Sequence, residues 1–320
     1  MREQDGRNHT ADTLKGFLVL LVIIGHIFNE PVMKNDIKRA IYLFHMPVFL
    51  GWSGYFFGQY RRGLSDLWTR SWPRYVCPWV IATAVFFAIL WWSTGKLPFT
   101  LEKAVLNPWF HLWYIPCLLF FSIIGASRKL PASALLPIFL TPHILLAFGA
   151  DIIKLIGNID DRYIYYGTYF AIGVVIKQLN FKTSIGISIL VLTVGILASI
   201  ATFHMRLAPW QLTLIRCMIV AGTICAVKAY PHGRTWLGSS VFATENLGIY
   251  LYHFVAIMIV RSQMTPSGPW YWAAAIIASM IALPALILVL RRLPGSSTIL
   301  GPQADARKAD NGIKPKPASA

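Results

Sequence analysis

The sequence predicts an all-α, polytopic integral membrane protein with about ten transmembrane helices. Of its 320 residues, 56% are hydrophobic and only 13% are charged, whereas a soluble domain has about 25% charged residues. The mean hydropathy is +0.56, so most of the surface must face lipid. Apolar runs recur from end to end, many with roughly the 20 residues that cross a hydrocarbon layer of about 30 Å.

Ten apolar runs follow one another along the chain. Five contain no charged residue: 40–60, 75–95, 104–127, 130–150 and 183–205. Five more follow the same rhythm, some of them shorter or carrying one charge: 16–29, 163–176, 207–227, 235–260 and 270–290. We therefore divide the chain into a cytoplasmic N-terminal segment (1–13), one membrane domain (14–293) and a disordered cytoplasmic tail (294–320) with too few large apolar residues to build a core.

Basic residues predict the orientation. Segments expected on the cytoplasmic side carry twice as many lysines and arginines as those expected outside, as the positive-inside rule requires. We expect an integral protein of the cell (inner) membrane with both termini in the cytoplasm. The net charge of +16 does not indicate nucleic-acid binding, because the basic residues are spread over membrane loops. Contact with anionic lipid headgroups accounts for much of the excess.

Two ionisable residues lie in the first apolar run. Lys15 and His26 are eleven residues apart, which is roughly 20° past three helical turns, so they share a helix face about 16 Å apart along the axis. Asp12 lies one turn before Lys15 and can pair with it. An interfacial lysine and a buried structural histidine are the ordinary interpretation, but ionisable groups within a span are costly and usually mark function.

Other histidines are expected at the depth of His26. His45, His111, His143 and His253 all fall in the outer halves of predicted spans. Histidine is the side chain best suited to general-base catalysis near neutral pH, although outer membrane interfaces also attract it. Among these side chains we favour His26 as the catalytic one.

The predicted cytoplasmic side carries a different signal. Arg70 and Arg74 are one turn apart if the third helix begins there, and like charges at that spacing repel. A bound polyanion would relieve that repulsion, and guanidinium groups form forked hydrogen bonds with phosphates. Simple positive-inside topology is the alternative, above all for Arg61 and Arg62.

Five short motifs occur in order over residues 12–255. They are Asp12-x-x-Lys15-Gly16 with Gly25-His26, Phe44-His45-Met46-Pro47 with Ser53-Gly54-Tyr55, Arg74-Tyr75-Val76-Cys77-Pro78, His111-Leu112-Trp113-Tyr114, and Gly248-Ile249-Tyr250-Leu251-Tyr252-His253. Together they resemble the acyltransferase 3 family of membrane O-acyltransferases. The lysine of the first motif, with its Gly-His pair, resembles the fucose 4-O-acetylase branch of that family.

This resemblance implies an O-acyltransferase without a metal, with acetyl-CoA as the acyl donor and a hydroxyl of a glycan, polysaccharide or lipid-linked sugar as the acceptor. Lys15, Arg70 and Arg74 would bind the phosphates of the coenzyme. His26 would carry catalysis with Lys15 and His45, either by deprotonating the hydroxyl or by holding the acyl group itself. The expected substrate-binding residues are His111, Trp113, Tyr114, His253 and Glu245.

A second function class remains open from the residues alone. Arg216 falls near the middle of the eighth run and Glu245 at the start of the ninth. The two could pair, or they could join Lys15 and His26 in a proton or substrate pathway of a secondary transporter. We find no inverted repeat in the sequence, and an inverted repeat would have favoured transport.

Overall fold

The computed structural model of the protein describes residues 8–58, 63–96, 100–108, 111–127, 130–149, 159–180, 183–203, 205, 207–230 and 235–303. Within these ranges all regular secondary structure is helical. The first half holds α1 (His9–Ile27), α2 (Asp36–Phe57), α3 (Leu64–Ser71), α4 (Cys77–Thr94), α5 (Leu101–Leu106), α6 (Tyr114–Ser127) and α7 (Ala132–Ala147). The second half holds α9 (Arg162–Tyr165), α10 (Gly167–Gln178), α11 (Ile185–Ala201), α12 (Pro209–Ala229), α13 (Trp236–Ser239), α14 (Val241–Thr244), α15 (Asn246–Gln263), α16 (Pro269–Ile276), α17 (Leu283–Leu290) and α18 (Ser296–Leu300).

The prediction of an all-α membrane protein is confirmed for the described residues, but the count of ten spans is not. Among the described residues, four helices are long and apolar enough to cross a membrane: His9–Ile27, Leu64–Trp92, Pro209–Ala229 and Pro269–Leu290. Three apolar helices are shorter, Tyr114–Ala126, Ala132–Ala147 and Ile185–Ala201. Expected spans are also interrupted. The run 104–127 divides into the end of α5 and α6, the run 163–176 divides into α9 and α10, and the run 235–260 divides into α13, α14 and α15.

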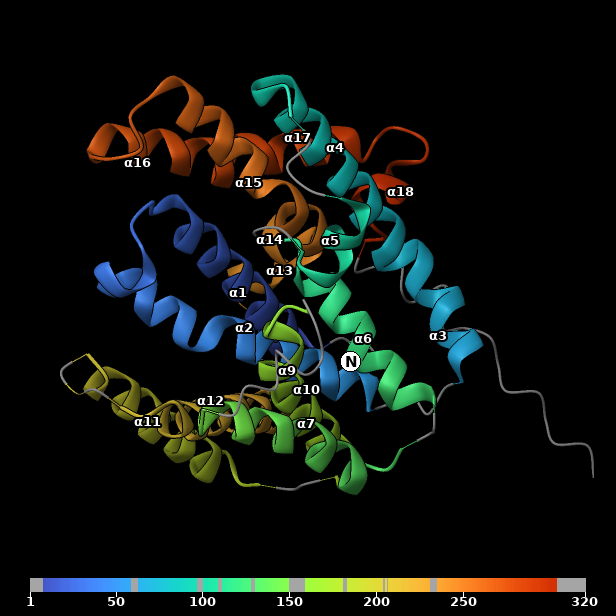
Figure 1. Cartoon of the computed structure of the whole chain (residues 1–320), viewed down its shortest axis with the longest axis vertical. Helices are drawn as coiled ribbons and strands as arrows, with labels where there is room; N and C mark the ends of the chain where they lie inside the picture. The colour runs from blue at the N-terminus through green and yellow to red at the C-terminus, as the bar shows by residue number, and fades with distance from the viewer. Residues whose placement is uncertain are drawn as a thin grey trace, which may run out of the picture.

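Helix α1 carries Lys15 and His26 through the middle of the bundle. Its first turn is capped by the side chain of Asn8, which accepts a hydrogen bond from the backbone nitrogen of Ala11 at 2.9 Å. The helix packs against α2 and α15, and also against the short helices α13 and α14. Figure 1 shows α1 and α2 between the group formed by α4, α15, α16 and α17 and the group formed by α7, α10, α11 and α12. Both ends of α1 therefore face neighbours from distant parts of the sequence.

Glycines bring α2 and α10 into backbone contact. A Cβ atom added to Gly54 would collide with the carbonyl oxygen of Phe170, and one added to Gly173 would collide with that of Gly51. Small residues at helix crossings allow this approach within membranes, where van der Waals packing replaces the hydrophobic drive. The contact holds the middle of α2, including Ser53, in a fixed position.

Two π-helical turns interrupt long helices, and a proline follows each of them closely. Trp72–Val76 joins α3 to α4, and Pro78 lies in the next turn. Ile277–Ala282 joins α16 to α17, and Pro284 follows in the same way. Proline lacks the N–H that would continue the i to i−4 ladder, and such bulges are frequent at functional sites. The first π turn carries Arg74.

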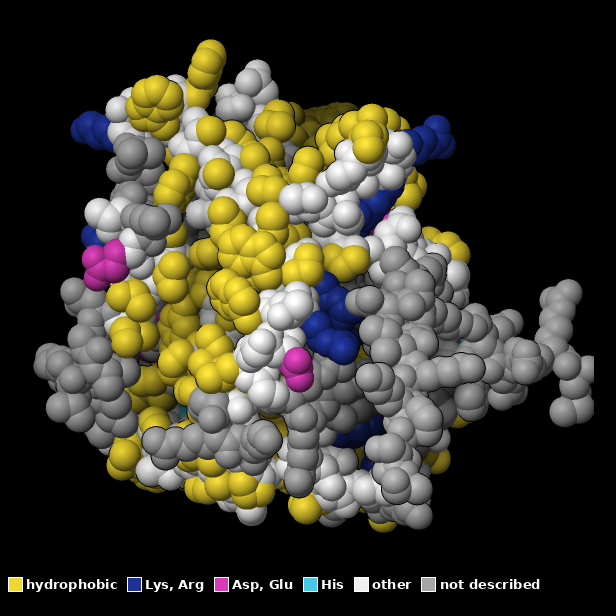
Figure 2. Space-filling view, turned by 90° about the vertical axis from the view of Figure 1, so that its right-hand side faces the viewer, with side chains coloured by type: hydrophobic (Ala, Val, Ile, Leu, Met, Phe, Trp, Pro, Cys, Tyr) yellow, Lys and Arg dark blue, Asp and Glu magenta, His cyan; other side chains and the backbone are white. Residues whose placement is uncertain are grey.

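Apolar side chains remain exposed where lipid is expected. Figure 2 shows a broad band of hydrophobic side chains on one face, with lysines and arginines beside it. On α3 and α4, Trp68, Val80 and Trp91 are exposed. A large exposed apolar surface of this kind suits contact with lipid rather than with water.

The predicted disordered tail begins too early. Residues 296–300 form α18, and Leu300 is only 1% exposed. This segment packs against α4 and α15, and its contacts are described below. The composition of 294–320 did not indicate that one leucine of this segment is buried or that a polar residue beside it makes a contact with the bundle. Residues 1–7 and 304–320 lie outside the described residues.

Candidate active site

Three histidines from distant segments meet beside the C-terminal end of α1. The ring centroid of His26 lies 5.9 Å from that of His111, which precedes α6, and 5.3 Å from that of His253 on α15. The rings of His111 and His253 are 4.7 Å apart. His111 and His253 are buried, whereas His26 keeps part of its surface accessible. Of the histidines expected at one depth, the structure therefore brings these three together.

Hydrogen bonds to carbonyl groups determine which nitrogens of two histidines carry a proton. Nε2 of His111 lies 3.0 Å from the carbonyl oxygen of Leu251, and Nδ1 of His253 lies 2.8 Å from that of Tyr250. A carbonyl oxygen only accepts, so in the neutral rings both of these nitrogens are N–H donors. Nδ1 of His111 and Nε2 of His253 are left as buried acceptors without a partner among the described residues. The cluster thus contains two buried nitrogen acceptors close to His26.

His45 lies outside this cluster. Its Nδ1 contacts the carbonyl oxygen of Ile41 at 2.6 Å, and its ring packs 5.0 Å from that of Tyr42. Tyr42 in turn lies 6.2 Å from the ring of His26. His143 is also separate, because Thr168 and Thr213 hydrogen-bond its two ring nitrogens at 3.0 and 2.9 Å. The structure brings neither His45 nor His143 into ring contact with His26 in its described part.

A cavity of about 390 Å³ lies toward the other end of α1, and the predicted cations line it. Lys15 comes from α1, Arg70 from the last turn of α3, and Arg74 from the π turn. Lys15 forms the predicted ion pair with Asp12, at 3.2 Å. Arg61 and Arg62 lie outside the described residues. Three cationic side chains around one cavity form a site suited to a phosphorylated ligand.

Hydroxyl groups line the cavity on the side toward the histidines. The Ser53 hydroxyl is 2.6 Å from that of Tyr114, and the rings of Tyr114 and Tyr250 are 5.6 Å apart. The hydroxyl of Tyr250 donates to the carbonyl oxygen of His111, while its ring lines the cavity. Tyr250 therefore connects the cavity wall directly to one of the clustered histidines.

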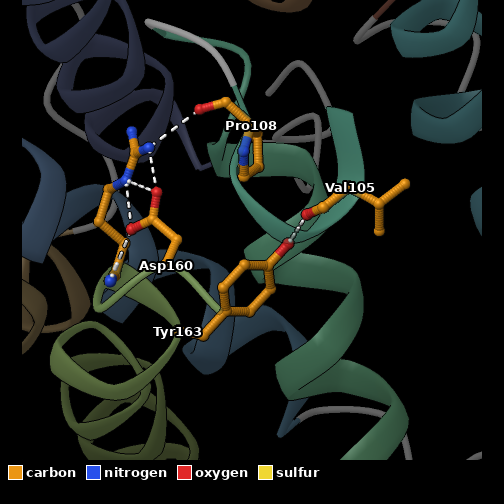
Figure 3. Close-up of polar contacts among 5 residues, drawn as sticks. Val105, Pro108, Asp160 and Tyr163 are labelled. Atoms are coloured by element: carbon orange, nitrogen blue, oxygen red, sulfur yellow. Dashed lines mark hydrogen bonds and ion pairs between the residues drawn. The ribbon is translucent and has the colours of Figure 1, made fainter. Parts of the chain in front are cut away.

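A side-chain brace holds the segment that leads into His111. Nη2 of Arg162 donates to the carbonyl oxygen of Pro108 at 2.9 Å, and its Nε lies 2.7 Å from a carboxylate oxygen of Asp160. Figure 3 shows Asp160 in this contact and the hydroxyl of Tyr163 reaching the carbonyl of Val105. Two of these contacts, at Val105 and at Pro108, hold the described segment that leads toward His111.

Trp113 takes part in the same brace. The guanidinium group of Arg162 lies 5.1 Å from the centre of its ring, and the ring of Tyr166 lies 4.6 Å from it. Trp113 is 7% exposed. Trp113 was expected to bind substrate, and in the structure its ring packs against Arg162 and Tyr166.

Glu245, an expected substrate-binding residue, does not pair with Arg216. Glu245 is 1% exposed, and its carboxylate contacts Arg291 at 2.6 Å and Gln303 at 2.7 Å. Nε of Arg216 instead donates to the carbonyl oxygen of Leu43 at 3.1 Å. Each carboxylate oxygen of Glu245 therefore has a partner within the protein. The sequence did not single out Arg291 or Gln303. Arg291 directly follows the last apolar run, and Gln303 lies in the predicted tail.

Trp52 is a cavity residue that sequence reasoning did not single out. It lines the cavity and is 3% exposed, and its indole N–H has no hydrogen-bond partner among the described residues. Its position directly before Ser53 in the second motif was the only available signal. An unpartnered buried donor is costly, so a ligand with an acceptor group would find a partner here.

Comparisons with known proteins agree with this arrangement. A family model described as "Acyltransferase domain" (acyltransferase 3) matches residues 8–289. Nodulation protein NolL of Sinorhizobium fredii (strain NBRC 101917 / NGR234) is 38% identical over 58 residues, which cover 16% of this chain and 16% of that protein. The chain thus matches only a small part of that relative. No solved structure matches.

Proposed function

The chain belongs to the acyltransferase 3 family. We propose that it is a membrane acyltransferase that transfers an acetyl group from acetyl-CoA to a hydroxyl group of a glycan or glycolipid. The observation that carries this proposal is the cavity of about 390 Å³, which is cationic at one end and has hydroxyl groups on the side toward the three histidines. A donor with phosphates at one end and a thioester at the other suits that polarity.

The cationic end is the proposed donor site. Arg70 and Arg74 can form forked hydrogen bonds with the phosphates of the coenzyme, and Lys15 adds a point charge. The slender pantetheine arm would extend along the cavity toward Ser53 and Tyr114. The positive-inside pattern supports a cytoplasmic position for this end, which is the compartment that supplies acetyl-CoA. A reporter fused at Gly95 should therefore read outside the cell.

The histidine cluster is the proposed acceptor site. A sugar hydroxyl would donate its proton to His26 while its oxygen attacks the thioester carbonyl carbon. The carbon–sulfur bond then breaks, and the proton passes to the departing thiolate to give free coenzyme A. An acyl-histidine intermediate is the alternative course. Hydroxyl groups of Ser53 and Tyr114 are the proposed donors to the oxyanion.

Purified protein offers the direct test. It should consume acetyl-CoA only in the presence of membrane glycans from its host cell, and mass spectrometry should find an acetyl increment on one glycan that a deletion strain lacks. Loss of that increment in the deletion strain, with acetyl-CoA turnover by the purified protein, would support the proposal. Uptake of a polar solute into proteoliposomes without acetyl-CoA turnover would identify a transporter instead.

A further inference from the structure

The chain folds back over the cationic end of the cavity after its last apolar run. We call residues 291–303 the return segment. At its beginning, Nη2 of Arg291 lies 2.6 Å from Oε2 of Glu245, and at its end Nε2 of Gln303 donates to Oε1 at 2.7 Å. Both oxygens of one buried carboxylate thus hold the two ends of the segment. Breaking a buried pair of this kind is costly because it leaves a charge uncompensated.

The middle of the return segment contacts the start of α15. Leu300 is 1% exposed, and a Cβ atom added to Gly248 would lie 3.4 Å from its Cδ2. The next residue, Gly301, has a φ of +76°, a conformation that favours glycine. A Cβ atom at Gly301 would come within 2.6 Å of Leu247. Leu247 lines the cavity, so the return segment supports part of the cavity wall.

The same glycine contacts the π turn. A Cβ atom added to Gly301 would lie 3.2 Å from the carbonyl oxygen of Arg74. Pro78, four residues after Arg74, has no N–H to donate to that oxygen, so the helix cannot hold this turn in the ordinary way. The return segment therefore lies against the backbone of a cavity arginine where the helix is irregular.

We propose that Glu245 is a positioning residue for the donor site. Through Arg291 and Gln303 it holds the return segment against the π turn and against Leu247, and so fixes the place of Arg74 in the cavity. Glu245 itself lies immediately before Asn246 and Leu247, which both line the cavity. The inference rests on the proposed function, because it takes this cavity as the site of coenzyme A.

Calorimetric titration of coenzyme A into the purified full-length protein tests both ideas separately. Binding by the wild type tests the donor site. Gln303→Ala removes one hydrogen bond at the surface of the cluster and should raise the Kd for coenzyme A about 3- to 10-fold, which corresponds to one hydrogen bond. The value of kcat at saturating acetyl-CoA should not change. Gln263→Ala, an exposed position at the far end of α15, is the matched control and should bind as the wild type does.

A double-mutant cycle separates positioning from general loosening. In an Arg74→Ala background, Gln303→Ala should have less than half of its effect on log Kd, because its influence passes through Arg74. Glu245→Gln should weaken binding more than Gln303→Ala does. A wild-type Kd for Gln303→Ala, or an equal effect of Gln303→Ala in both backgrounds, would overturn the inference while leaving the donor site intact. No binding of coenzyme A by the wild type would overturn the donor site, and the inference with it.

Discussion

The two ends of α1 differ in the kind of side chains that surround them and in how closely those side chains pack. Around Lys15, long cationic side chains border a cavity of about 390 Å³. Around His26, aromatic rings pack at centroid distances of 5 to 6 Å, and carbonyl groups hold two of the imidazoles. Charge attracts a ligand over a distance and tolerates some movement, whereas proton transfer requires contact at hydrogen-bond length. If the proposed function holds, donor binding uses the open cavity, and proton transfer uses the closely packed histidines.

The largest effect is expected at the rigid end. His26→Gln should leave the protein folded, since the histidine makes no hydrogen bond through its ring to a described residue, and should lower acyl transfer about 10²- to 10⁴-fold through loss of a base. Acetyl-CoA turnover by purified protein measures it. His9→Gln, the same change at the opposite end of α1, should keep full activity. Near-normal turnover of His26→Gln would make His26 a structural residue and would move the chemistry to His253 or His45.

A smaller and different effect is expected in the cavity. Arg74→Ala should raise the apparent KM for acetyl-CoA about 10- to 100-fold, as expected from lost hydrogen bonds between charged groups. The value of kcat at saturating donor should stay near the wild-type value. Arg74→Lys should restore little, because lysine lacks the planar fork. Steady-state kinetics with varied acetyl-CoA concentration measure both constants. An unchanged KM with normal protein levels would show that Arg74 contributes only to membrane orientation.

Tyr250 tests whether the two ends are coupled. Tyr250→Phe keeps the ring in the cavity wall but removes the hydroxyl that holds the carbonyl of His111. Since small displacements of a reacting group are costly, we expect kcat to fall about 10-fold with little change in the KM for acetyl-CoA. Tyr75→Phe, which also alters a cavity tyrosine, is the control. A rise in KM alone would place Tyr250 with the donor residues.

The smallest effect is expected for Arg162, whose contacts hold the segment that precedes His111. Arg162→Lys keeps the charge but loses the fork that joins Asp160 to the carbonyl of Pro108. We expect a fall in kcat of about 2- to 5-fold and a loss of a few degrees in melting temperature, the scale of about 1 kcal/mol. Turnover and thermal unfolding of the same preparation provide both readings. Equal kcat with a lower melting temperature would show that the brace stabilises the fold alone.

Much of this site could be predicted from local sequence. Helical spacing places Lys15 and His26 on one face, and the spacing from Asp12 predicts the ion pair at 3.2 Å. Alternation of apolar runs with polar loops predicts that His111 and His253 lie at the depth of His26. The first two predictions follow from the helical period, and the third follows from the length of chain that crosses a membrane.

The partner of Glu245 could not be predicted in this way. Arg291 and Gln303 lie 46 and 58 residues further along the chain, and no sequence pattern connects either of them with a buried carboxylate. The exact number of membrane spans could not be predicted from the sequence either. Several apolar runs are broken by prolines, glycines and short helices, whose lengths depend on the helices that pack around them.

By itself, the sequence determined the all-α membrane class, the family motifs and the residue types that can bind phosphates or accept protons. Only the tertiary structure decided which of them meet. It joins His26, His111 and His253 and leaves out His45, it places Arg70 and Arg74 on one cavity, and it pairs Glu245 with Arg291 and Gln303. The physical reason is that hydropathy and helical period act within one segment, whereas contacts between segments depend on packing across the whole bundle.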